Sequence, residues 1–449
     1  MHQHPLQHRQ DRQDRQRTPW RNHHGQRLLR YGAALLGAAM VAACGGGGDG
    51  GGSGSGGGGS AASTSSAPAV PVRLCPAALD YTTTFTGGTG SGELVKVQID
   101  TTRKTWQVTF LDSSVPRTTG TVLPTRSDTT GGQNVMTGTL SQETGLPTDK
   151  LNQCAFQLNG ASLDPNRPAR LFVGDGVAGG TIPGARIQFN GVLGAGAVPD
   201  TTFPYFQFIG FAQTETDLTK IAGQYNGYGF HEVPSKNFQT VAQDYRMALA
   251  ADGSFQVCDN KTGGTCSQKG KSFVPQANGS LMSANYKGEI DPPTLGATLG
   301  RAYLIVGKLR GQLVPVMIRV GYANGSLTNG MALGADDEIG IGMMAPAIAV
   351  TQGTVNGEYV GVDSNFDYRT TALVAADAAM LDPFHPSDAS LATALKLDFS
   401  QQLAGVVTTT RKDGAAGSPT GKFIFTGGVF GFLESRSAGP YFTIGAFVQ

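Results

Sequence analysis

The stretch FNGVLGAGAVPDTTFPYFQFIGFAQ occupies residues 189–213, and a related stretch, FTGGVFGFLESRSAGPYFTIGAFVQ, occupies residues 425–449. In an extended strand over residues 203–211, apolar side chains would fall on both faces, with Phe203, Tyr205, Ile209 and Phe211 on one and Phe206 and Phe208 on the other. Such a pattern is typical of a strand that is buried between two layers or lines a barrel. A small apolar pocket at the mouth of a barrel is the functional alternative.

The two stretches are related by an alignment without gaps. They share Phe189, Gly191, Pro204, Tyr205, Phe206, Phe211 and Gln213, which recur as Phe425, Gly427, Pro440, Tyr441, Phe442, Phe447 and Gln449. A second similarity links DYRMALAAD at residues 244–252 with DYRTTALVAAD at residues 367–377. We therefore infer three diverged β modules of domain size, at residues 75–213, 221–346 and 351–449.

Alternating apolar and polar residues dominate the rest of the chain from residue 75 onward. Residues 94–99 (LVKVQI) and 106–110 (WQVTF) alternate around a short polar turn and predict a hairpin with one apolar face. Residues 371–381 (TALVAADAAML) fit either a helix or a strand. Frequent short strands without sustained helical periodicity predict an all-β fold of antiparallel meander modules, of the sandwich or small barrel type.

Composition and charge narrow the class of protein. The chain has 449 residues, 65 of them Gly, with 34 Lys and Arg against 33 Asp and Glu. Residues 1–43 contain seven Arg and two Asp, so their removal would leave 27 basic and 31 acidic side chains. A nearly neutral, slightly acidic body lacks the positive charge that nucleic-acid binding requires. We therefore expect no nucleic-acid partner.

The N-terminal part reads as an export signal followed by a tether. Residues 31–43 (YGAALLGAAMVAA) form an uncharged apolar run behind a long polar, Arg-rich n-region, and small residues precede Cys44. Thirteen residues are too few to cross a bilayer permanently. Residues 44–72, which begin with Cys44 and GGGGDGGGSGSGGGGS, predict a flexible, disordered linker.

The sequence around Cys44 resembles the lipobox of bacterial lipoproteins, and the whole chain resembles putative lipoproteins of Gram-negative bacteria. The resemblance implies that residues 1–43 are a signal peptide, cleaved before Cys44. The new N-terminal cysteine would then be acylated by fatty acids such as palmitate and would anchor the protein in a membrane. Gly45, which stands where an aspartate favours retention at the inner membrane, implies the outer membrane, facing the periplasm or the cell surface.

Four further cysteines fit an oxidising compartment. Cys75, Cys154, Cys258 and Cys266 are even in number and allow three disulfide connectivities. We favour Cys258–Cys266, which would clip a turn-rich hairpin, together with Cys75–Cys154. A zinc site would need CxxC spacing or a neighbouring histidine, and the sequence has neither there.

Motifs that carry chemistry are weak in this chain. Residues 174–179 (GDGVAG) match GxGxxG, but another strand rather than a helix follows, which predicts a hairpin loop. His231 and Glu232 begin an HExxH-like motif that Pro234 and Ser235 break. Residues 363–367 (DSNFD) begin like a calcium loop but lack its later ligands and predict a solvated turn. The acidic run at residues 336–338 (DDE) predicts a solvated loop, or a group that meets a cation or basic partner.

These observations predict a lipid-anchored cell-envelope protein that binds an unknown protein or small-molecule ligand. No residue is assigned a catalytic role, and no cofactor or metal is expected, so the chain leans away from enzymes. A structural spacer in the envelope is one alternative. The other is a carboxylate-based hydrolase, which needs only two Asp or Glu side chains.

Overall fold

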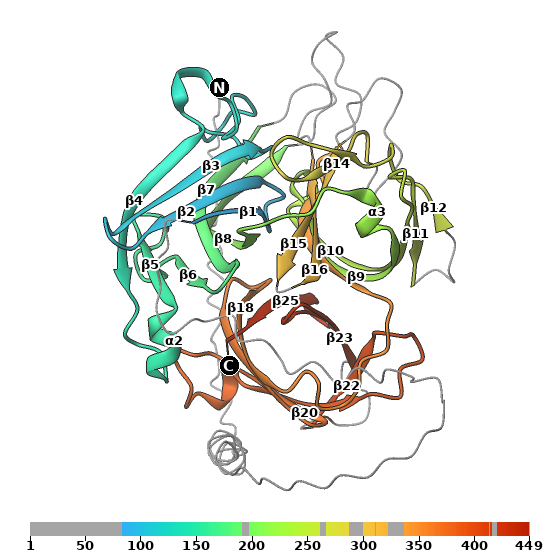
Figure 1. The fold of residues 1–449 in the computed structure, drawn as a ribbon. Coiled ribbons are helices and arrows are strands. Elements are labelled where there is room, and N and C mark those ends of the chain that lie inside the picture. Colours follow the sequence, from blue (N-terminus) through green and yellow to red (C-terminus); the bar gives the residue numbers. More distant parts are fainter. Residues whose placement is uncertain are drawn as a thin grey trace, which may run out of the picture. The chain divides into compact units, whose positions relative to one another are not determined.

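The computed structural model describes residues 83–190, 197–260, 266–286, 300–309, 311–321, 336–412, 414 and 420–448. The predicted signal peptide, Cys44, the linker and Cys75 lie outside these residues. Within them the chain forms antiparallel sheets, two of which close into barrels, so the all-β prediction is confirmed. Figure 1 shows the three sheets in the order in which the chain makes them.

The first sheet is a closed barrel in which each strand pairs with its sequence neighbours and the first pairs with the last. Its strands are β1 (Thr84–Thr89), β2 (Leu94–Asp100), β3 (Thr105–Asp112), β4 (Val135–Gln142), β5 (Ala155–Asn159), β6 (Arg170–Val173), β7 (Val177–Phe189) and β8 (Val198–Phe211). The predicted hairpin is β2 and β3, and residues 174–176 turn between β6 and β7, as expected of the glycine-rich loop.

The middle sheet is open, with the strand order β12-β11-β10-β9-β17-β16-β15-β14-β13. Its strands are β9 (Gly223–Val233), β10 (Gln239–Leu249), β11 (Phe255–Asp259), β12 (Cys266–Ser267), β13 (Val274–Pro275), β14 (Leu281–Ser283), β15 (Arg301–Leu309), β16 (Gln312–Val320) and β17 (Ile339–Pro346). The two edge strands are very short, which limits edge-to-edge pairing. The disulfide Cys258–Cys266 joins β11 to β12, in the pairing that the sequence favours.

The third sheet is again a closed barrel. Its first strand, β18, pairs with β19 on one side and with the last strand, β25, on the other. Its strands are β18 (Gly357–Asp363), β19 (Tyr368–Val374), β20 (Asp377–Leu381), β21 (Thr393–Asp398), β22 (Val407–Arg411), β23 (Thr420–Thr426), β24 (Val429–Arg436) and β25 (Gly439–Phe447). Residues 371–381 therefore belong to the hairpin of β19 and β20 and not to a helix.

Helices are few and short among the described residues. They are η1 (Thr130–Gly132), α2 (Asp149–Gln153), α3 (Leu218–Ile221), η2 (Pro234–Lys236) and η4 (Ala389–Leu391). In the part of the chain that the structure describes, no helix is long and apolar enough to cross a membrane.

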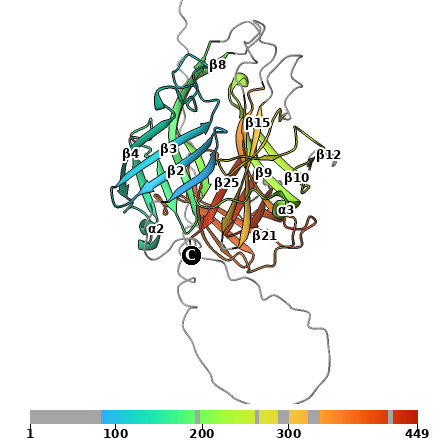
Figure 2. The same ribbon diagram turned by 45° about the horizontal axis from the view of Figure 1, so that its top comes forward.

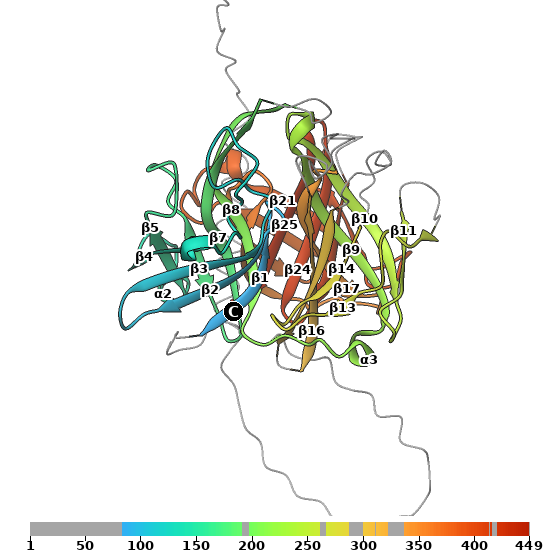
Figure 3. The same cartoon turned by 90° about the horizontal axis from the view of Figure 1, so that it is seen from above.

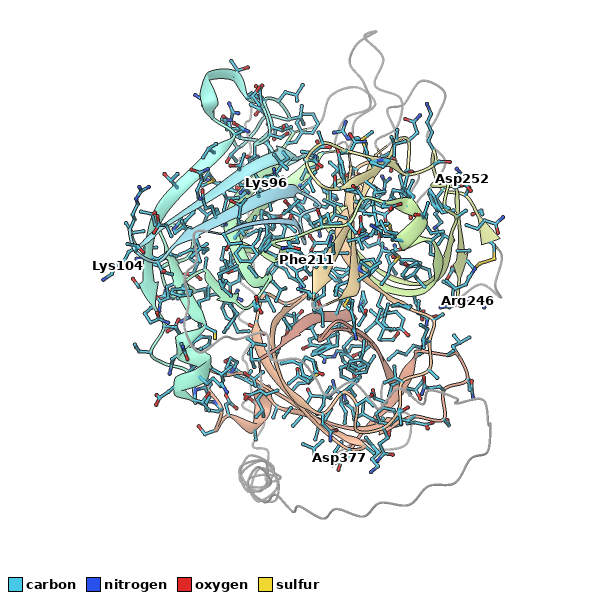
Figure 4. The ribbon with its side chains drawn as sticks, viewed as in Figure 1. Lys96, Lys104, Phe211, Arg246, Asp252 and Asp377 are labelled. Carbon is cyan, nitrogen blue, oxygen red and sulfur yellow. A yellow bond between two sulfur atoms is a disulfide. The ribbon has the colours of Figure 1, made fainter. Side chains whose placement is uncertain are left out.

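Strand β8 has both faces covered, as its pattern predicts. Phe208 packs over Gly87 and Gly210 of its own barrel. On the other face, Gln207 donates a hydrogen bond to the carbonyl of Val362 in the third barrel. Phe211 lies against Gly307 of β15, where a Cβ atom would come within 2.3 Å of the ring. Figure 4 labels Phe211 near the meeting point of the three sheets.

The three sheets share apolar cores. One buried cluster contains Phe211 of the first barrel, Ile318 and Met343 of the middle sheet and Phe430 of the third barrel. Strands β24 and β25 lie against β9. Figure 2 shows β25 beside β9, and Figure 3 shows all three strands. Each sheet falls inside one of the three segments inferred from the repeats, but its outer face depends on the other two for burial.

The interior of the third barrel is filled by side chains. The ring of Phe423 lies 4.4 Å from that of Phe432 and 5.2 Å from that of Phe430, measured between centroids. At the polar end, Glu434 is fully buried and accepts hydrogen bonds from Arg411 and Arg436. Small barrels are commonly filled in this way, which leaves the junctions between the sheets as the places for a binding site.

Candidate functional site

A pocket lies between the first barrel and the middle sheet. Its closed part has a volume of about 20 Å³, and the rest of its empty space opens to solvent. The lining residues are Ser114, Val115, Pro116, Thr121, Val122, Ile187, Gln188, Phe189, Val198, Pro234, Asp337 and Ile339. Apolar walls with a few polar groups are what small-molecule sites usually offer.

The loop at residues 113–134 forms one wall of the pocket, and buried polar contacts hold it in place. Arg126 reaches into the barrel, where its guanidinium lies 3.9 Å from the centroid of the Phe110 ring and its Nε lies 3.5 Å from Glu93 Oε1. Ser113 donates a hydrogen bond of 2.6 Å to the same carboxylate. Since Glu93 is fully buried, these contacts tie the loop firmly to the barrel.

The opposite wall includes Asp337, which carries the one carboxyl group among the lining residues that the structure describes. Asp337 is only 4% exposed and accepts hydrogen bonds from the backbone N–H of Ser235 at 2.6 Å and from its hydroxyl at 3.0 Å. Burial raises the pKa of Asp337, the bonds from Ser235 oppose this shift, and the charge of Asp336 adds to it. A buried carboxyl group with a raised pKa in a pocket marks a candidate functional site.

Glu338 belongs to a polar network inside the middle sheet. His231 Nδ1 donates a hydrogen bond of 2.6 Å to Glu338 Oε1, and Gln243 donates another of 3.2 Å to the same atom. Burial disfavours ionisation of Glu338, but the hydrogen bond and charge of His231, with the charge of Arg319, outweigh it and lower the pKa of Glu338. This network lies directly behind the pocket wall.

Asp336 is held by Arg319 within the same network. Arg319 is 1% exposed and donates a hydrogen bond to Asp336, while the N–H of Gly300 donates to the other carboxylate oxygen at 2.6 Å. A Cβ atom at residue 300 would come within 1.9 Å of Arg319 Nη1, so this place requires glycine. The arrangement fixes the backbone on both sides of Asp337.

The structure corrects two predictions about acidic residues. The run at residues 336–338 is not a solvated loop, because all three carboxyl groups are buried among hydrogen-bond donors. Asp363 is likewise fully buried, as the last residue of β18 before the turn to β19. It accepts hydrogen bonds from the N–H groups of Asn365 and Asp367 and from Arg369, so it caps the turn.

The remaining residues that the sequence singled out lie elsewhere. The Cys258–Cys266 disulfide is on the far edge of the middle sheet and does not line the pocket. Cys154 is buried after α2, whereas its expected partner Cys75 and the lipidation residue Cys44 lie outside the described residues. Within the described residues no group of three or more His, Cys, Asp or Glu side chains is arranged to hold a metal ion.

Sequence reasoning missed the pocket loop. The segment SSVPRTTGTV at residues 113–122 has the composition of an ordinary turn, and its role depends on contacts with β7 and with residues more than 200 positions later. The buried ion pair between Arg126 and Glu93 could not be predicted either, because the two residues are far apart in the sequence and belong to no spacing motif. The DDE run was the one available signal.

Three antiparallel sheets with shared cores and a pocket between two of them define an all-β protein with a candidate binding site. The chain belongs to the family described as "Protein of unknown function (DUF2957)", whose model matches residues 105–446. No curated protein and no solved structure matches the chain significantly.

Proposed function

We propose that this protein is a lipid-anchored protein of the cell envelope, attached at the outer membrane through Cys44, that binds a small molecule between the first barrel and the middle sheet. The pocket bounded by residues 114–122 and Asp337 is the observation that carries the proposal. Its aliphatic walls supply affinity, and its few polar groups supply orientation.

The alternatives find less support. A glycosidase needs two carboxyl groups facing one cleft, whereas the described lining residues of this pocket include one carboxyl group. A spacer made of independent modules would have separate cores, but one cluster of buried residues runs through all three sheets. A fixed pocket within one compact body favours binding.

Dye binding tests the pocket. N-phenyl-1-naphthylamine, whose emission rises in apolar surroundings, should bind the full chain. The substitution Val122→Trp should fill the pocket and weaken binding by at least about tenfold, or 1.4 kcal/mol. Thr118→Trp is the matched control, because Thr118 lies in the same loop but is exposed and outside the lining. Equal loss in both variants, or in neither, would refute the pocket.

Membrane fractionation tests the anchor separately. The Cys44→Ser variant should leave the membrane fraction, because the acyl chains supply the binding free energy, about 0.8 kcal/mol for each buried CH₂ group. A Cys44→Ser variant that remains fully membrane-bound would contradict the anchor while leaving the pocket untouched.

A further inference from the structure

Asp337 differs from the other buried carboxylates of this protein. Among the described residues, each of the other Asp and Glu residues that is at most 9% exposed has an Arg or Lys side chain within 4.0 Å, and the pairs are Glu93–Arg126, Asp112–Arg301, Glu143–Arg170, Asp244–Lys422, Asp336–Arg319, Glu338–Arg319, Asp363–Arg369 and Glu434–Arg411. Among the described residues, Asp337 has hydrogen bonds from Ser235 but no cationic partner. It is also the one carboxylate of this set that lines the pocket.

An unpaired buried charge is costly, and proteins normally pair it or neutralise it. The two bonds from Ser235 leave acceptor capacity on the Asp337 carboxylate, since a carboxylate offers about four lone-pair sites. Asp336 adds negative charge nearby, but its own carboxylate is occupied by Arg319 and Gly300. Asp337 lines the pocket, so a ligand in the pocket is the available source of a cation for its free acceptor sites.

The rest of the lining is suited to an apolar body. Val115, Ile187, Val198 and Ile339 are buried around the pocket, and Ser114, Thr121 and Gln188 are its neutral polar groups. Among the described lining residues there is no Lys or Arg.

We infer that the pocket binds a small amphiphilic cation, with its ammonium group on the Asp337 carboxylate and its hydrocarbon body against the aliphatic wall. This inference rests on the proposed function and names its ligand class. The ligand supplies the cation that Arg or Lys supplies at the eight paired carboxylates.

Three probes with the same hydrocarbon body and different heads test the inference. Hexan-1-amine, hexan-1-ol and hexanoate are titrated by ligand-observed NMR at pH 7.5 into the full chain carrying Cys44→Ser. The amine should bind at least about tenfold more tightly than the alcohol, and hexanoate more weakly than the alcohol. Asp337→Asn keeps hydrogen-bond partners for Ser235 and should bring the affinity for hexan-1-amine down to that for hexan-1-ol.

Glu232→Gln is the matched control. This substitution also removes a carboxylate close to the pocket, because Glu232 of β9 lies opposite Ile339 of β17. Glu232 itself is not among the lining residues. Amine binding should persist in this variant. Equal affinity of the amine and the alcohol for the unsubstituted pocket, or equal loss of amine binding in both variants, would overturn the inference. If neither the amine nor the alcohol binds, the pocket proposal itself fails, so the two failures are distinguishable.

Discussion

Tyr205 and Tyr441 occupy matching places in the two PYF stretches, yet their side chains face opposite sides of their barrels. Tyr205 donates a hydrogen bond of 2.7 Å to the carbonyl of Phe366, outside its own barrel. Tyr441 lies inside its barrel, with Arg436 stacked 3.5 Å from the centroid of its ring. A shift of one residue in a strand exchanges its faces, so related sequences here support different contacts.

Removal of a hydroxyl group should destabilise the protein more at Tyr368 than at Tyr205. The hydroxyl of Tyr368 accepts a bond from the N–H of Arg170, bonds to Thr181 and donates to the carbonyl of Pro168, all in the first barrel. Tyr205→Phe should lower the free energy of unfolding by about 1 kcal/mol, and Tyr368→Phe by about 2–3 kcal/mol because buried partners lose their bonds. Urea denaturation measures both, and equal effects would contradict the expectation.

Gly300 should not tolerate a methyl group. Gly300→Ala would push against the Arg319 guanidinium and the buried acidic network behind the pocket, at an expected cost of about 1–3 kcal/mol. Gly179→Ala is the control, because the nearest atom to its added Cβ would be at an ordinary distance of 3.8 Å. The thermal unfolding midpoint should fall in Gly300→Ala and stay close to the wild-type value in Gly179→Ala. An unchanged midpoint in Gly300→Ala would contradict the prediction.

Asp337→Asn should stabilise the ligand-free protein at neutral pH. Because burial raises the pKa of Asp337 above 3.8, the folded state binds the proton more tightly than the unfolded chain does. The wild-type protein therefore loses stability relative to Asp337→Asn as the pH rises from 3.8 through the raised pKa, and the difference is constant above it. Denaturant curves from pH 3.5 to 8 measure this difference, which should vanish at the acidic end.

Glu232 provides a second test of the same physics. Burial raises the pKa of Glu232 from 4.5 to about 7. Its ionised form is therefore unfavourable in the folded state, so the penalty grows between pH 4.5 and 7 and is complete above 7. Glu232→Gln should raise the free energy of unfolding at pH 8 by about 1–3 kcal/mol relative to wild type and leave it unchanged at pH 4. A stability loss at pH 8 would be the contrary result.

The sequence predicts the strands well because alternation is a local property. Residues 94–99 and 106–110 form β2 and β3, and the doubly apolar run in residues 203–211 is covered on both sides. The secondary structure of residues 371–381 could not be predicted from the local sequence. An Ala-rich run has a high helix propensity, and only pairing with neighbouring strands makes it a β hairpin.

The candidate site was far less predictable. A DDE run is usually solvated, and nothing near residues 336–338 reveals that Arg319, His231 and Ser235 converge on it. The pocket depends in the same way on contacts between segments that are distant in the chain. Local patterns carry no information on such contacts, so the site appears only once the sheets are packed together.

The pairing of β18 with β25 has a consequence for the order of events during synthesis. The third barrel cannot close until residues 439–447 have been made, and this barrel covers apolar surface on both of the earlier sheets. Domains in most long chains fold one after another as they emerge. Here the first two sheets stay uncovered on one side until residues 439–447 have been made, so closure of the third barrel is a late step that completes the cores of all three sheets.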